Sequence, residues 1–192
     1  MGVDVGGRRK AFDVALVEDG RLIGLRHRQS VDDVVGWVAP ARPAVVAIDS
    51  PRSCAAPGRT HRPEEKELRD AVCGIRWTPP IAQLAGNPYY EWIVEGLRLY
   101  DALGEQPVQV IECFPTASWT RWHGPRGGRR RAAWTREALG ALDLRDVPAR
   151  TNQDMRDAIA AALTARDYAQ GRFEAFGDIV VPRISSRRRG AG

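Results

Sequence analysis

Short apolar runs alternate with amphipathic stretches along this chain, and the alternation predicts an α/β domain. The opening "GVDVGG" is typical of a short strand. Residues 11–29 predict two strands joined at Asp19-Gly20, a dipeptide that favours the tight turn of a hairpin. The apolar, β-branched runs at 44–49 and 108–114 predict buried strands, and "GDIVVPRI" near the end predicts a last short one.

Apolar positions at helical spacing separate these strands. They predict helices at 31–39, 62–72, 87–103, 130–142 and 151–170. Thr151 with Asp154 resembles a capping box at the start of the last helix. The element order predicts a mixed sheet whose first three strands are antiparallel, with helices on both faces and one domain over residues 1–182.

Composition excludes several protein classes. The 192 residues are 43% hydrophobic and 28% charged, and no apolar run approaches the roughly 20 residues of a membrane span. We see no signal peptide in "MGVDVGGRRK" and expect a cytoplasmic protein. Three widely spaced cysteines without a C-x-x-C pair argue against a zinc ribbon and a disulfide framework.

The positive charge is concentrated in two places. Four of the +5 net charges come from arginines in residues 183–192, which we expect to form a disordered basic tail with non-specific attraction to nucleic acid. A second cluster, "RWHGPRGGRRR" at 121–131, is either a solvated loop or a phosphate-contacting arm. We favour the solvated loop because charge runs are common on surfaces.

Acidic residues stand at or near the carboxyl ends of three predicted strands: Asp4 in "GVDVGG", Asp49 in "VAIDSP" and Glu112 in "VIECFP". In open α/β sheets, functional sites gather at the carboxyl ends of strands. Asp49 alone fits a turn before Pro51 equally well. Three such acids are harder to explain as turn formers, because a carboxylate after an apolar strand is costly to bury.

The last predicted helix adds two carboxylates, Asp154 and Asp157, which are three residues apart and share a face. Alanines at 158, 161, 162 and 165 continue that face, and small side chains would let the helix lie close to the sheet. A favourable interaction with the helix dipole is the alternative; capping explains Asp154 better than Asp157. Converging carboxylates without a basic partner require protonation or a divalent cation, and oxygen ligands select Mg²⁺ or Mn²⁺.

Four segments together resemble a known family: "GVDVGG", "AIDSP", "ECFPTAS" and "QDMRDAIAAALTA". They are similar to the predicted ribonuclease H-like nuclease family called domain of unknown function 429, over the chain to about Pro182. The resemblance implies a ribonuclease H-like fold with a five-stranded mixed sheet, hydrolysis of phosphodiester bonds with Mg²⁺ or Mn²⁺, and DNA or RNA as the partner. "RPEEKELRDAV" is also similar to an Arg-rich helix of that family, which would place Arg62 and Arg69 near the site.

The resemblance assigns a role to each candidate residue. Asp4, on a central strand, would bridge paired metal ions, and Asp49 and Asp157 would each complete the coordination of one ion. Asp154 and Glu112 are candidate outer or alternative ligands, and the candidate phosphate contacts are Ser50, Arg52, Arg62 and Arg69. We expect Asp13, in the hairpin, to take no part.

Two other functions compete with the nuclease. "GVDVGGRRKAFDVALV" is similar to the first phosphate loop of the actin and sugar-kinase superfamily, which predicts a phosphotransferase or ATPase. Against it, the chain has no second Asp-x-Gly-Gly loop and room for only one of the two halves of such proteins. A non-catalytic binding module of ribonuclease H-like fold is the third possibility, and ion-dependent stabilisation would separate it from the nuclease.

Overall fold

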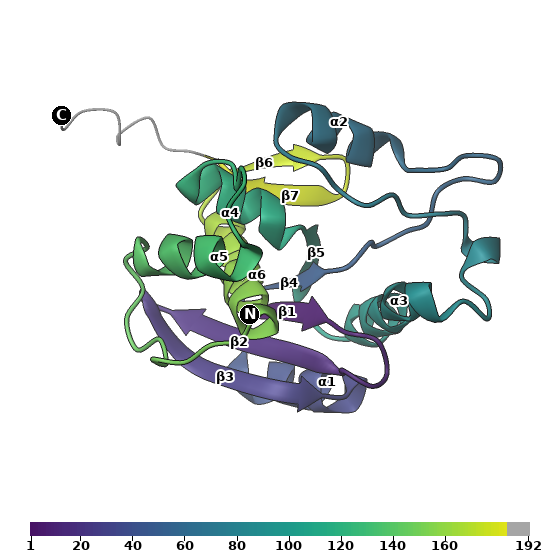
Figure 1. The fold of residues 1–192 in the computed structure, drawn as a ribbon. Coiled ribbons are helices and arrows are strands. Elements are labelled where there is room, and N and C mark those ends of the chain that lie inside the picture. The colour runs from purple at the N-terminus through teal and green to yellow at the C-terminus, as the bar shows by residue number, and fades with distance from the viewer. Residues whose placement is uncertain (184–192) are drawn as a thin grey trace.

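The computed structural model describes residues 1–183 and shows one mixed sheet with helices on both faces (Figure 1). Its seven strands are β1 Gly2–Val5, β2 Phe12–Glu18, β3 Arg21–Gln29, β4 Val45–Asp49, β5 Gln109–Cys113, β6 Phe173–Phe176 and β7 Ile179–Pro182. Their order in the sheet is β3-β2-β1-β4-β5-β7-β6. The expected hairpin turns at Asp19-Gly20, where both residues have positive φ angles of 46° and 70°.

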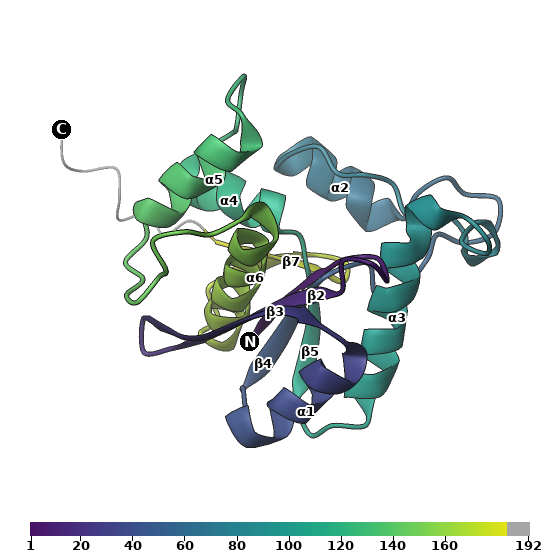
Figure 2. The same ribbon diagram turned by 60° about the horizontal axis from the view of Figure 1, so that its bottom comes forward.

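The α-helices are α1 Val31–Ala41, α2 Pro63–Ala71, α3 Glu91–Gly104, α4 Pro115–His123, α5 Arg131–Gly140 and α6 Gln153–Ala169. Short 3₁₀ turns, η1 Ile81–Gln83 and η2 Pro88–Tyr90, precede α3. Helices α1 and α3 cover one face of the sheet, and α6 covers the other, with α4 and α5 packed against it (Figure 2). No helix in the described part of the chain is long and apolar enough to cross a membrane.

The expectation of a five-stranded sheet was wrong, because a C-terminal hairpin adds two strands. Strands β1 to β5 have the expected arrangement, with β1, β2 and β3 antiparallel and β4 parallel to β1. Strand β7 then pairs parallel with β5, and β6 pairs antiparallel with β7. The sequence predicted β7 but not β6, since the four residues "FEAF" are too short to show a strand pattern beside a long helix.

Two further details differ from the sequence-based expectations. Asn152, rather than Thr151, caps α6, and its side chain accepts a hydrogen bond from the Met155 amide at 2.7 Å. The expected basic tail at 183–192 lies, apart from Arg183, outside the described residues.

Helix α6 packs against β1, β2 and β4 through its alanines, as predicted. Ala158 and Ala161 are fully buried and Ala162 is 2% exposed. The backbone of the helix comes so close to β1 that a Cβ atom on Gly2 would lie 1.9 Å from the Ala162 amide nitrogen. This contact holds the N-terminal end of α6, which carries the aspartates, next to the carboxyl ends of β1 and β4.

Candidate active site

Asp4 and Asp49 lie side by side on adjacent parallel strands. They are register partners at the carboxyl ends of β1 and β4. Side chains alternate along a strand, and since Gly2 faces α6, Asp4 faces it too. Burial raises the pKa of Asp4 well above its ordinary value, and the charges of Asp49 and Asp157 raise it further. The pair therefore attracts either a proton or a cation.

The pKa of Asp49 is raised from 3.8 to about 8, mainly by burial and next by the charge of Asp157. Arg131 opposes the increase, as does a hydrogen bond with Asp4. Within residues 1–183 neither Asp4 nor Asp49 forms an ion pair. These two carboxyl groups are the part of the site whose charge is least compensated.

Asp157 joins this pair from α6 but has donors of its own. Its side chain is 4% exposed and accepts hydrogen bonds from Trp119 Nε1 at 3.1 Å, Arg131 Nη2 at 2.9 Å and Gln153 Nε2 at 3.0 Å. Burial still raises its pKa, while Arg131 and the hydrogen bonds lower it. The expectation that the carboxylates converge without a basic partner was therefore wrong for Asp157.

Asp154 also has a basic partner. Lys10 Nζ lies 3.0 Å from its Oδ2, and this contact raises the pKa of Lys10. The side chains of Lys10 and Asp154 are 68% and 32% exposed, so the ion pair is at the rim of the site. Lys10 comes from the loop after β1, which brings a positive charge to a position where the sequence suggested only acids.

Glu112 does not join the other carboxylates. Ile48 and Glu112 are register partners, and Ile48 belongs to the core beneath α1 and α3, so Glu112 faces away from α6. Arg62 binds both of its carboxylate oxygens, and the Arg52 amide donates to it at 2.8 Å. Burial nevertheless raises the pKa of Glu112. Its proposed role as a metal ligand lacks support, because its oxygens are committed to this buried ion pair.

Cys113 occupies the position on β5 where the sequence suggested an acid. It follows Glu112, so its thiol faces α6, and it belongs to the same core cluster as Ala161 and Ala165. Burial raises its pKa well above 9.0, and the charges of Asp49, Glu112 and Asp4 add to the shift. A neutral, 2% exposed thiol thus closes one side of the carboxylate group.

The three arginines that the sequence suggested as phosphate contacts interact with different parts of the protein. Arg62 is 2% exposed and is neutralised by Glu112 and Glu65. Arg69 lies over the Trp77 ring at 5.1 Å from its centroid. Arg52 donates to the Val110 carbonyl at 3.1 Å. Arg62 and Arg52 thus have hydrogen-bonded partners, whereas the exposed Arg69 side chain donates no hydrogen bond within residues 1–183, and its role as a phosphate contact stays a prediction.

Ser50 differs from these arginines. It is 2% exposed, and its Oγ has no hydrogen-bond partner within residues 1–183. A Cβ atom on Gly96 would lie 2.0 Å from this oxygen, so a glycine on α3 is required for the contact. Ser50 is also one of the residues that line the cleft described next.

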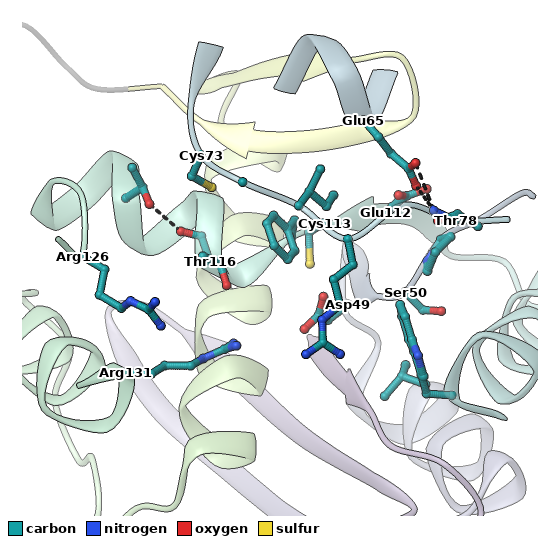
Figure 3. Close-up of a pocket in the computed structure, with 18 of the residues that line it drawn as sticks. Asp49, Ser50, Glu65, Cys73, Thr78, Glu112, Cys113, Thr116, Arg126 and Arg131 are labelled. Carbon is teal, nitrogen blue, oxygen red and sulfur yellow. Dashed lines mark hydrogen bonds between the residues drawn. The ribbon is translucent and has the colours of Figure 1, made fainter. Parts of the chain in front are cut away.

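A cleft of about 670 Å³ opens over the carboxyl ends of β4 and β5 (Figure 3). Asp49 and Ser50 line it, as do Thr116 of α4 and two arginines of the 121–131 segment, Arg126 and Arg131. Figure 3 shows both arginine side chains reaching toward Asp49 from the same side. The segment that we expected to be a solvated loop therefore supplies two cations to the cleft wall.

The acidic side chains are suitable metal ligands, but in this structure they are not arranged around a common ion position. Within residues 1–183, no three histidine, cysteine, aspartate or glutamate side chains are grouped closely enough to hold an ion as they stand. The chemistry of the donors fits Mg²⁺ or Mn²⁺, since Asp4, Asp49 and Asp157 offer only oxygen and their charges raise the pKa values of Asp4 and Asp49. Asp157 is paired with Arg131, and this ion pair has to open before all three carboxylates can share an ion.

Comparison with known proteins decides the family. The family described as "Protein of unknown function (DUF429)" matches residues 2–180. The chain belongs to this family. Similar solved structures include the "Thermus thermophilus RuvC structure", with a TM-score of 0.47 and 20% identity over 88% of this chain and 94% of that chain. No curated protein matches the sequence.

For this DUF429 protein, sequence reasoning missed one residue at the site and favoured the wrong alternative for two others, which belong to the 121–131 segment. Arg131 pairs with Asp157 and Arg126 lines the cleft. Asp13, expected to lie outside the site, is the register partner of Asp4 on β2 and raises the pKa of Asp4. One signal was available for Asp13: in "FDVALV" an acid interrupts a strand whose other residues are apolar.

Proposed function

We propose that this DUF429 protein is a divalent-metal-dependent nuclease that hydrolyses phosphodiester bonds at the carboxyl ends of β1 and β4. The observation that carries the proposal is the in-register pair Asp4 and Asp49, which lies beside Asp157 without an ion pair to either member within residues 1–183. Two buried carboxyl groups that repel each other are costly in a folded protein. A bound cation converts that cost into affinity.

Asp4, Asp49 and Asp157 would hold the ion. When bound, Mg²⁺ or Mn²⁺ would activate water and neutralise charge on the phosphate. Arg131 has a second role in this proposal: its 44% exposed side chain could exchange Asp157 for a phosphate oxygen. Arg126, on the same wall of the cleft, would help to position the phosphate.

The proposal is tested by ion binding and hydrolysis together. Mn²⁺ and Mg²⁺ should raise the melting temperature of the wild type, because an ion that binds only the folded state stabilises it. They should also support cleavage of labelled DNA or RNA oligonucleotides. Asp4→Asn should lose both effects. Asp101→Asn is the matched control, since Asp101 is exposed on α3 near its end distant from the site, and should lose neither.

The alternatives give different results. A non-catalytic module without a site would show no ion-dependent stabilisation. A phosphotransferase or ATPase would bind the ion and hydrolyse or transfer the terminal phosphate of ATP while leaving oligonucleotides intact. Ion-dependent cleavage that survives in Asp4→Asn would overturn the proposed site.

A further inference from the structure

A histidine continues the row of site residues across the sheet. Asp13 on β2 is the register partner of Asp4 on β1, and His27 on β3 contacts Asp13, with 2.6 Å between His27 Nδ1 and Asp13 Oδ1. The strands β3, β2, β1 and β4 are neighbours in the sheet. One row of side chains therefore runs across them, near the carboxyl ends of β1 and β4, and consists of His27, Asp13, Asp4 and Asp49. The proposed function uses only one end of this row.

An irregularity between β2 and β3 places the histidine. Pairing passes from Phe12 opposite Gln29 to Val14 opposite Arg26, so that both His27 and Arg28 oppose Asp13. Such bulges redirect side chains and occur often beside active sites. Arg28 has a φ angle of 56°, a conformation that costs a non-glycine residue energy, and its amide donates to Asp13 Oδ1 at 3.3 Å.

Asp13 is built to hold the imidazole. It is 3% exposed, and its Oδ2 has no hydrogen-bond partner within residues 1–183. A buried carboxylate is costly without a hydrogen-bond donor, and the imidazole N–H at Nδ1 supplies one. The His27 side chain is 44% exposed, and its Nε2 forms no hydrogen bond within the described residues. The ring is therefore fixed at one nitrogen and open at the other.

We infer that His27 is a phosphate-binding residue positioned by Asp13, and that the substrate is a polynucleotide strand extending from the cleft across β1 and β2. This inference rests on the proposed function. Arg126 and Arg131 stand on the cleft side of Asp49, and His27 on β3 stands three strands away from Asp49 on β4, about 14 Å at the usual strand spacing. A single nucleotide held at Asp49 does not span that distance, whereas the next phosphates of a strand do.

Binding measurements distinguish a strand from a nucleotide. The probes are fluorescently labelled single strands of roughly 12 nucleotides, as DNA and as RNA, and a labelled mononucleotide, with Ca²⁺ replacing Mg²⁺ so that binding is measured without cleavage. His27→Gln should weaken binding of the strand about five- to tenfold and leave the mononucleotide unchanged.

The matched control is Arg42→Gln. Arg42 is an exposed cation three residues before β4, at the opposite end of that strand from Asp49, and its loss should leave strand affinity unchanged. His27→Lys should restore binding, because a lysine ammonium also binds phosphate. Melting temperatures of all variants show whether each is folded.

Asp13→Asn separates positioning from structure. It should weaken strand binding in the wild-type background but have no further effect in a His27→Lys background, where no imidazole needs to be held. Equal losses in both backgrounds would assign Asp13 a purely structural role and overturn the inference. Unchanged strand affinity in His27→Gln would overturn it while leaving the nuclease intact. Failure of the nuclease itself appears separately, as a wild type that Mn²⁺ does not stabilise.

Discussion

Gly2 on β1 touches the backbone of Ala162 on α6. A Cβ atom at Gly2 would lie 1.9 Å from the Ala162 amide nitrogen and 2.4 Å from the Ala158 carbonyl oxygen. Backbone atoms of a packed helix cannot yield locally, so a larger side chain at this position has to displace α6. Since α6 carries Asp157, the distance between this aspartate and the β1–β4 pair depends on a residue without a side chain.

Gly2→Ala should therefore lower stability by about 1–3 kcal/mol, the usual cost of overpacking. Denaturant unfolding measures this loss. Gly36→Ala is the control: Gly36 lies inside α1, where an added Cβ would meet no atom within 4 Å, and the variant should gain about 0.5–1 kcal/mol. Equal small effects at both glycines would contradict the close contact between β1 and α6.

The sequence allowed prediction of Asp4, Asp49 and Asp157 as candidate site residues but not of the groups that compensate their charges. Acids at strand ends and on the alanine face of the last helix could be recognised by local spacing alone, and the structure brings Asp4, Asp49 and Asp157 together. A sequence shows which face of the sheet an acidic side chain occupies only where polar and apolar residues alternate along the strand. In "VQVIECF" both faces carry apolar residues and one polar residue each, so the sequence could not show that Cys113 rather than Glu112 faces α6.

Long-range ion pairs were beyond prediction for a different reason. Arg131 reaches Asp157 across 26 residues that include an irregular segment, and Lys10 reaches Asp154 across 144. Ion pairing between residues so far apart depends on the conformation of the loops between them, and local sequence patterns do not predict that conformation. The sequence did not predict how the C-terminal hairpin pairs for the same reason. The position of β7 in the sheet depends on its pairing with β5, which its own four residues do not indicate.

Removing Arg62 should destabilise the protein strongly. Arg62→Met leaves Glu65 and Glu112 buried and unpaired, which typically costs about 3–5 kcal/mol. Lys66→Met, on the same helix, breaks an ion pair with Asp70 whose side chains are 64% and 60% exposed, and should cost less than about 1 kcal/mol. Urea unfolding of both variants gives the comparison. Similar costs would show that the Arg62 cluster is solvated.

Glu112→Gln examines the other end of this ion pair. If Glu112 is structural, the variant should lose stability and still gain melting temperature with Mn²⁺, because the ligands on the α6 face remain. Loss of the Mn²⁺ effect from a folded Glu112→Gln protein would restore Glu112 as a ligand.

Stability without metal should fall as pH rises from about 4 to 8. The pKa of Asp49 is about 8 in the folded state against an ordinary value of 3.8, so between these values the folded protein holds a proton that the unfolded chain has released. Asp49→Asn should remove much of this dependence and stabilise the metal-free protein at pH 8, where the wild type holds a buried carboxyl group that tends to ionise. Thermal melts in EDTA across the pH range test this, with Asp101→Asn as the control that keeps the wild-type profile.

The ion pair between Arg131 and Asp157 should compete with the metal. Arg131 Nη2 lies 2.9 Å from Asp157 Oδ2, and its charge lowers the pKa of Asp49 as well. Two unit charges 4 Å apart interact by about 1 kcal/mol even in bulk water, and a divalent ion is repelled more strongly. Arg131→Gln should therefore tighten Mn²⁺ binding at least about fivefold, read from the Mn²⁺ concentration that gives half of the maximal rise in melting temperature.

The same substitution should weaken oligonucleotide binding, because it removes a cation from the cleft wall. Arg130→Gln is the matched control: Arg130 is the exposed residue before α5 and forms no ion pair within residues 1–183, so neither affinity should change. Opposite changes in ion and oligonucleotide affinity at Arg131 alone would show that this arginine alternates between Asp157 and the phosphate. Weaker Mn²⁺ binding in Arg131→Gln would instead mean that Arg131 holds Asp157 in the geometry that the ion needs.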